Sequence, residues 1–147
     1  MSPKDFVVKD RGVGKGLGVY SLKAYSKGDL IANISGEIVN EHMLHTLQIT
    51  SEKHLYDPDF TGCLLHSCDP NAIILPEKLE VWAVKNIKTG DAITIDYATT
   101  ENRIVRQFPC ACGQSNCRRW ITGRKEMVNE EGIEYLTKIE ENQNEHS

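Results

Sequence analysis

Three cysteines near the C-terminal end are the side chains in this sequence best suited to chemistry. Cys110, Cys112 and Cys117 lie within eight residues of one another in an otherwise polar segment. Zinc prefers thiolate ligands and takes four of them in a tetrahedron in structural sites. The three thiols therefore predict a zinc site that recruits a fourth ligand from elsewhere. With four thiolates this zinc is structural, because no position stays open for water.

Cys68 is the natural candidate for the fourth ligand, with Cys63 and His66 as weaker ones. The alternative, reduced thiols in an ordinary loop, is disfavoured because free cysteines usually lie in apolar surroundings, which this segment does not offer. The N-terminus lacks the apolar stretch of a secretory signal. We therefore expect an intracellular, reducing environment, where metal binding is more common than disulfide formation.

A second candidate group combines residues 64–71 with Tyr97. Residues 64–71 read Leu-Leu-His-Ser-Cys-Asp-Pro-Asn, a short apolar run that leads into a thiol and turn-forming residues. Residues 92–97 alternate like a strand and end in the phenol of Tyr97. If Cys68 lies with Cys110, Cys112 and Cys117, the segment 64–71 and the distant segment that follows Tyr97 surround one pocket. A core tyrosine with a satisfied hydroxyl is the alternative interpretation of Tyr97.

Two further patterns give weaker signals. Every second residue from 12 to 18 is glycine, which lets a ligand approach the main chain closely but is equally typical of a hairpin or bulge. Its spacing is not that of a dinucleotide-binding loop. His42 and His45 could share a metal, but no third ligand is near in sequence, so we favour exposed or structural histidines.

The elements that position these residues are predominantly strands. Turn residues separate short apolar or alternating runs, which favours a mostly β fold. Strands are predicted at 6–8, 19–21, 30–35, 47–50, 72–75, 79–84 and 92–97. A short helix is predicted at 41–46, with Asn40 as its N-cap, and another from about 126, before a disordered tail at 142–147.

Length and charge exclude several classes of protein. The chain has 147 residues, the length of one domain, and no apolar run approaches the roughly 20 residues needed to cross a bilayer. The net charge of −4 provides no general attraction to nucleic acid. Basic residues near the late cysteines and an acidic C-terminal end are interpreted as solvated surface. We expect neither a membrane nor a nucleic-acid partner.

Taken in order, these motifs resemble a SET-domain protein-lysine methyltransferase with a post-SET zinc motif. The resemblance spans about residues 6–123. Residues 14–18 are similar to the family's glycine-rich cofactor loop, and Gly36-Glu37 to its early glycine-glutamate pair. Residues 65–71 resemble its Asn-His-Ser-Cys-x-Pro-Asn motif, residues 90–97 the strand that ends in its catalytic Asp-Tyr, and residues 110–121 its post-SET segment.

The resemblance implies a compact β fold in which the segment 65–68 threads through a loop that carries Tyr97, a knot-like arrangement. It also implies that Cys68 joins Cys110, Cys112 and Cys117 on zinc. The expected organisation is a SET domain at 1–106, a post-SET zinc segment at 107–123, and a C-terminal helix and acidic tail at 124–147.

The resemblance further implies transfer of a methyl group from S-adenosylmethionine to a lysine of a protein substrate, which enters from the opposite face. Tyr97 would be the catalytic residue that orients the amine or the methyl. The cofactor-binding residues carried over by position are Lys15, Gly16, Leu17, Leu65, His66, Tyr97 and Trp120, the last as a cover over the cofactor.

Three positions depart from the family's pattern. Leu65 stands where an asparagine is expected, Ile34 replaces a tyrosine, and Gly62 replaces an arginine. A lost buried hydrogen bond costs on the order of 1 to 3 kcal/mol, enough to weaken cofactor binding about tenfold or more. The alternative hypothesis is therefore a non-catalytic SET-like interaction module with structural zinc.

Overall fold

Short strands in several small sheets make up most of this protein, which is described by a computed structural model. The structure describes residues 5–10, 17–42, 46–58, 60–110, 112 and 114–145. The strands are β1 Phe6–Asp10, β2 Leu17–Ser21, β3 Leu30–Asn33, β4 Glu37–Val39, β5 Thr46–Gln48, β6 His54–Tyr56, β7 Leu65–His66, β8 Ala72–Leu75, β9 Glu80–Ala83, β10 Thr94–Ile95, β11 Phe108–Pro109 and β12 Trp120–Ile121. Two 3₁₀ turns, η1 Thr61–Cys63 and η2 Tyr97–Thr99, and the helix α1 Glu130–Glu145 complete the described elements.

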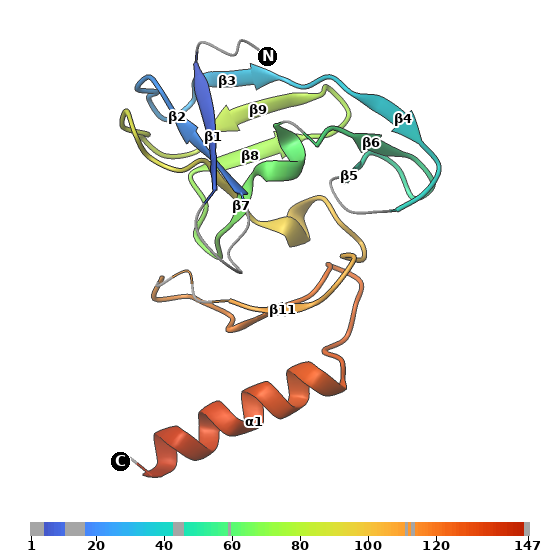
Figure 1. The fold of residues 1–147 in the computed structure, drawn as a ribbon, viewed down its shortest axis with the longest axis vertical. Coiled ribbons are helices and arrows are strands. Elements are labelled where there is room, and N and C mark those ends of the chain that lie inside the picture. The colour runs from blue at the N-terminus through green and yellow to red at the C-terminus, as the bar shows by residue number, and fades with distance from the viewer. Residues whose placement is uncertain are drawn as a thin grey trace.

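The sheets built from β1 to β10 form an upper body, and the C-terminal segment, which carries β11, β12 and α1, extends below it (Figure 1). Antiparallel pairing joins β1 with β2, orders β3-β9-β8 and β4-β6-β5, and joins β11 with β12. The pair β7 and β10 is parallel. The helix α1 lies at the end of the molecule remote from the β3-β9-β8 sheet.

Apolar side chains between the sheets of the upper body form the main core. Val19 and Val81 are fully buried, and Leu55 and Phe60 are nearly so. Alternation along β8 and β9 explains part of this burial, since every second side chain of these strands points inward. The strands predicted at 72–75 and 79–84 are confirmed as β8 and β9 and form an antiparallel hairpin, with Ala72 paired to Ala83.

Two predictions about local structure in the middle of the chain are wrong. Where a helix was predicted at 41–46, Glu41 and His42 are not helical and Thr46 begins β5; residues 43–45 lie outside the described residues. The strand predicted at 92–97 is reduced to β10, because the Asp96 side chain accepts the Ala98 N–H and starts η2.

The C-terminal helix extends beyond its predicted end. A disordered tail was predicted from residue 142, whereas α1 continues to Glu145. Asn129 begins it, because its side-chain oxygen accepts the Gly132 N–H at 2.9 Å, and Glu130 and Glu131 complement the positive end of the helix dipole. Both signals are present in the sequence.

Candidate active site and thiol cluster

Parallel pairing of β7 with β10 brings Tyr97 to the 64–71 stretch. In this register Thr94 lies opposite Leu65 and Ile95 opposite His66, so the chain emerges from β10 directly at Tyr97. The Tyr97 hydroxyl donates to the Leu64 carbonyl at 2.6 Å. The phenol is therefore fixed against the main chain of the segment that sequence analysis paired with it.

Asn71, the last residue of that stretch, fastens the two segments together. Its side-chain oxygen accepts the Thr94 N–H at 2.9 Å, and its side-chain amide donates to the Ala92 carbonyl at 2.8 Å. The Asn71 N–H donates to the Thr94 hydroxyl at 3.0 Å. Because these bonds use both ends of the amide, Asn71 acts as a clamp that sets the position of β10.

His66 supports the main chain of Tyr97. The Tyr97 N–H donates to His66 Nδ1 at 3.2 Å, which requires an unprotonated Nδ1. Burial lowers the pKa of His66 to about 4, although Asp96 raises it, and Arg118 lowers it further. The ring is therefore neutral near pH 7, and its remaining proton belongs on Nε2, 3.6 Å from the Cys68 sulfur.

Two clefts meet at Tyr97 and Phe108, which line both. The larger, of about 950 Å³, is bordered by Leu65, His66 and the thiol segment at Cys110 and Cys112. The smaller cleft has a volume of about 350 Å³. Besides Tyr97 and Phe108 it is lined by His42, Thr46, Leu47, Thr61, Gly62, Leu64, Ile95, Thr100, Glu101, Ile104, Val105 and Arg106. A tyrosine between two clefts can contact a ligand in either.

Phe108 is a site residue that sequence analysis missed. Its ring meets the His66 and Tyr97 rings edge-on, at centroid distances of 5.8 and 6.0 Å. The only sequence signal is an aromatic residue two positions before Cys110. Its place at the junction of the clefts comes from the pairing of β11 with β12.

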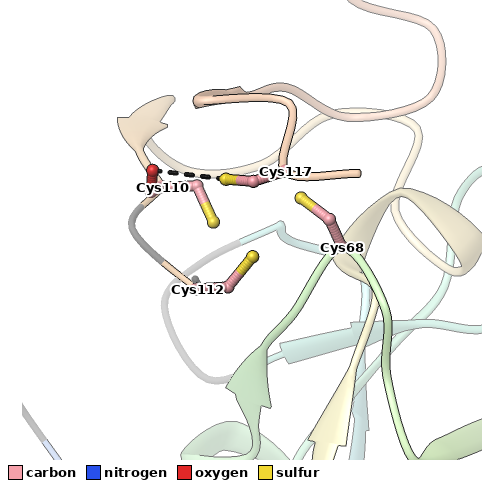
Figure 2. A group of neighbouring side chains, drawn as sticks. All are labelled: Cys68, Cys110, Cys112 and Cys117. Carbon is pink, nitrogen blue, oxygen red and sulfur yellow. Dashed lines mark hydrogen bonds between the residues drawn. The ribbon is translucent and has the colours of Figure 1, made fainter. Parts of the chain in front are cut away.

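The four predicted thiols lie together, although 42 positions separate Cys68 from Cys110 in the sequence (Figure 2). All four sulfurs are within 4.8 Å of one another. Zinc–sulfur bonds of about 2.3 Å in a tetrahedron place sulfurs roughly 3.8 Å apart, so this cluster fits a zinc ion. Cys63 lies elsewhere, buried, with its thiol donating to the Pro58 carbonyl.

Cationic and N–H groups surround the cluster. The Arg118 N–H donates to the Cys68 sulfur at 3.3 Å, and the Asn116 amide donates to the Cys68 carbonyl at 2.9 Å. Burial raises the pKa of the Cys110 thiol well above its ordinary value. A bound divalent cation is the group that deprotonates such a thiol, because it stabilises the thiolate directly.

The predicted cofactor residues are placed unevenly. Leu65 and His66 line the larger cleft with Tyr97. Leu17, half exposed, begins β2 opposite Asp10. Lys15 and Gly16 lie outside the described residues.

Trp120 is not among the described residues that line the larger cleft. It is 5% exposed, its indole packs against Tyr135 of α1 at a centroid distance of 5.6 Å, and the indole N–H donates to Gln107 at 2.9 Å. Its role as a cover over the cofactor stays a prediction. Phe108 is the aromatic residue of this segment that borders the cleft.

The three residues that depart from the pattern of the resembled family lie in different parts of the structure. Leu65 places an aliphatic side chain at the larger cleft. Ile34 is 5% exposed and belongs to the main core, and Gly62 borders the smaller cleft.

A mostly β domain with a tyrosine between two clefts and four adjoining thiols is the arrangement expected of a SET domain. The SET domain family model matches residues 16–98, more than half of the chain, and this chain belongs to that family.

Curated relatives include the "Histone-lysine N-methyltransferase, H3 lysine-36 specific" of Debaryomyces hansenii, 28% identical over 134 residues. That alignment covers 75% of this chain and 18% of the relative. "Histone-lysine N-methyltransferase Su(var)3-9" of Drosophila melanogaster is 25% identical over 146 residues, covering 72% and 23% of the two chains. The chain thus spans less than a quarter of these two relatives.

Solved structures share the fold. The methyltransferase domain of human SETMAR superposes with a TM-score of 0.61 at 20% identity, covering 80% of this chain and 58% of that chain. KRYPTONITE in complex with mCHG DNA and SAH gives a TM-score of 0.61 at 21% identity, covering 78% and 29%. Among the residues that the structure describes, no helix is long and apolar enough to span a membrane.

Proposed function

We propose that this chain is a protein-lysine N-methyltransferase that uses S-adenosylmethionine. The observation that carries the proposal is the position of Tyr97, whose ring borders both clefts while its hydroxyl is fixed on the Leu64 carbonyl. The names of its relatives make a histone the first protein substrate to test.

The larger cleft suits the cofactor. It is bordered by Leu65 and His66, and it is large enough for a nucleoside-sized ligand. SAH in the KRYPTONITE complex supports S-adenosylmethionine as the cofactor, since SAH is what remains of it after methyl transfer. Phe108 offers an aromatic surface at the cleft, and Lys15, Gly16 and Leu17 are proposed to complete the site.

The smaller cleft suits the lysine side chain. Leu64, Ile95 and Ile104 provide apolar walls that match the methylene groups of lysine and exclude water. S-adenosylmethionine supplies an electrophilic methyl on a sulfonium. A desolvated amine beside that cation loses its proton more easily, so the walls favour the neutral nucleophile.

Tyr97 then has a defined role. Its proton is donated to the Leu64 carbonyl, so the phenol oxygen keeps lone pairs that can accept a hydrogen bond from the amine. The bond to Leu64 also restricts rotation of the hydroxyl. Holding the amine in one direction addresses the main requirement of this reaction, which is alignment of nucleophile and methyl.

The thiol cluster is proposed to bind one structural zinc through Cys68, Cys110, Cys112 and Cys117. The distances between the four sulfurs support this assignment, because they suit tetrahedral coordination. The zinc would fasten the segment that carries Phe108 beside the larger cleft.

Radiolabelled methyl transfer to core histones and nucleosomes tests the proposal. Wild-type protein is expected to label a histone lysine, and Tyr97→Phe is expected to reduce turnover by about a hundredfold. Zinc content and melting temperature, measured for both proteins, would show that the variant is folded. Unchanged turnover in a folded Tyr97→Phe protein would contradict the role of Tyr97.

A non-catalytic SET-like module is the second candidate, favoured by the aliphatic Leu65 at the larger cleft. Isothermal calorimetry with S-adenosylmethionine separates the two. The enzyme is expected to bind the cofactor measurably, and Leu65→Asn to bind it about tenfold more tightly. Absence of binding at millimolar cofactor, together with absence of histone labelling, would favour the module.

A further inference from the structure

Arg118 follows the last thiol of the cluster and contacts the segment that carries Tyr97. We infer that Arg118 is a positioning residue that couples the thiol cluster to Tyr97. The inference rests on the proposed function for its catalytic meaning, although the coupling itself can be measured without any methyl transfer.

The main chain of Arg118 belongs to the cluster. Its N–H donates to the Cys68 sulfur at 3.3 Å, and Arg118 directly follows Cys117. N–H donors to a thiolate stabilise its negative charge, so this bond is strongest when the cluster holds its metal. The position of Arg118 therefore depends on the cluster's geometry.

The guanidinium of Arg118 reaches the chain before Tyr97 while it also interacts with the Cys68 thiol. It donates to Asp96 Oδ1 at 2.6 Å and lies 3.3 Å from His66 Nε2. The Asp96 side chain is 18% exposed and that of His66 3%, whereas the Arg118 side chain is 41% exposed. The Asp96 and His66 side chains are thus largely shielded from water, and the Arg118 side chain is partly exposed.

Asp96 and His66 each hold the main chain around Tyr97. The same Asp96 oxygen accepts the Ala98 N–H at 3.1 Å, which starts the turn η2, and His66 Nδ1 accepts the Tyr97 N–H at 3.2 Å. Arg118 neutralises the buried end of Asp96 and orients its carboxylate. Without that cation the carboxylate would rotate toward water, and the turn that aims the phenol would loosen.

Coupling of this kind is reciprocal, because both ends share the same interactions. Loss of zinc would release residues 110–118 and remove Arg118 from Asp96. Removal of the Arg118 side chain alone would loosen the Tyr97 turn while leaving all four thiols in place. The two perturbations should therefore have overlapping effects on Tyr97.

Exchange of the Tyr97 amide hydrogen, followed by NMR in the full chain, measures this coupling directly. Zinc-loaded Arg118→Ala is expected to retain one zinc per chain and to exchange the Tyr97 amide about tenfold faster than wild type. Chelation of wild-type protein should accelerate the same amide. Chelation of Arg118→Ala should accelerate the amide by a smaller factor than chelation of wild type, because the Arg118 connection is already broken and the Phe108 contact with Tyr97 is what remains to be lost.

Matched variants separate this role from a general effect of charge. Lys125→Ala removes a cation from the same segment and should leave Tyr97 exchange unchanged, because the Lys125 side chain is exposed and forms no ion pair with the residues that the structure describes. Arg118→Lys keeps the charge without the planar fork and should fall between wild type and Arg118→Ala. In an active enzyme, Arg118→Ala should lower kcat about tenfold while changing the KM for cofactor less than about threefold.

Unchanged Tyr97 exchange in zinc-loaded Arg118→Ala would overturn the inference. It would also be overturned if chelation accelerated this exchange by the same factor in Arg118→Ala as in wild type. If Arg118→Ala loses its zinc, Asp96→Asn decides, since it removes the charge from the other end and leaves the cluster intact. Faster exchange in zinc-loaded Asp96→Asn supports the coupling, and unchanged exchange overturns it. Because the exchange measurements do not depend on turnover, a chain without methyltransferase activity would refute the proposed function alone.

Discussion

Different interactions stabilise the upper body and the C-terminal segment. In the upper body, strands β1 to β10 bury a continuous set of aliphatic and aromatic side chains. The second cluster of buried apolar residues is small and consists of Cys68, Ile104, Cys110 and Ile121. Hydrophobic burial scales with area, so the second cluster alone provides little stability.

Polar contacts and the thiol cluster supply the stability that the few apolar residues of the second cluster do not provide. Gln107 accepts N–H groups from Trp120 and Asn129 and donates to Glu126, which joins β11, β12 and the start of α1. Tyr97 packs against both clusters and is the point where the two regions meet. The proposed catalytic residue thus depends on a stable body and on a segment that needs a metal.

Removal of zinc is expected to have the largest effect. Cys112→Ser or chelation should release residues 104–145 while the β3-β9-β8 sheet stays folded, because a structural zinc contributes about 10–16 kcal/mol of apparent binding energy in small domains. Hydrogen exchange by mass spectrometry, with zinc measured by elemental analysis, checks this. Cys63→Ser is the control and should keep its zinc. Equal protection of both regions after chelation would contradict the comparison.

A cavity in the upper body should act independently of zinc. Leu55 is 1% exposed, so Leu55→Ala is expected to cost about 2–5 kcal/mol of unfolding free energy. Urea titration of the zinc-loaded and chelated proteins should give the same loss in both. A loss confined to the zinc-loaded protein would mean that the two regions do not have separate sources of stability.

A change at Gly132 should loosen α1 alone. A β-carbon at Gly132 would overlap the Trp120 indole, so Gly132→Ala should cost about 1–3 kcal/mol instead of gaining the usual helix propensity. Thermal denaturation and hydrogen exchange of α1 check this. Glu134→Ala, at an exposed position of the same helix, should change stability by less than about 0.5 kcal/mol. A stabilised Gly132→Ala protein would show that the indole moves aside at little cost.

The smallest effect is expected at Glu101, which links the regions by accepting the Gln48 N–H at 3.0 Å. Burial raises the pKa of Glu101, while hydrogen bonds from Gln48 and Thr100 and the charge of Arg124 lower it. Protonation of Glu101 is thus more favourable in the folded than in the unfolded state. The free energy of unfolding that this difference contributes is lost as pH rises through the folded pKa. Glu101→Gln keeps an acceptor, so its stability should fall less than wild type over this pH range. Parallel stability curves of the two proteins would refute this.

Several features were determined by the sequence alone. Alternating strands and the hairpin at 72–84 follow from local patterns, since side-chain period needs only neighbouring residues. The C-terminal helix was also predicted, although from about residue 126, whereas α1 begins at Glu130 after its cap Asn129. The order of the motifs also indicated the family. The expectation that Cys68 joins three late thiols came from ligand number and resemblance, and the structure places all four sulfurs together.

Tertiary structure alone decided which side chains meet. Phe108 and Trp120 are both aromatic residues near thiols, and only the pairing of β11 with β12 and the docking of α1 direct one to the cleft and enclose the other. Similarly, Arg118 reaches Asp96 across 22 positions of sequence. Such contacts depend on where distant segments pack against one another, which no local periodicity encodes.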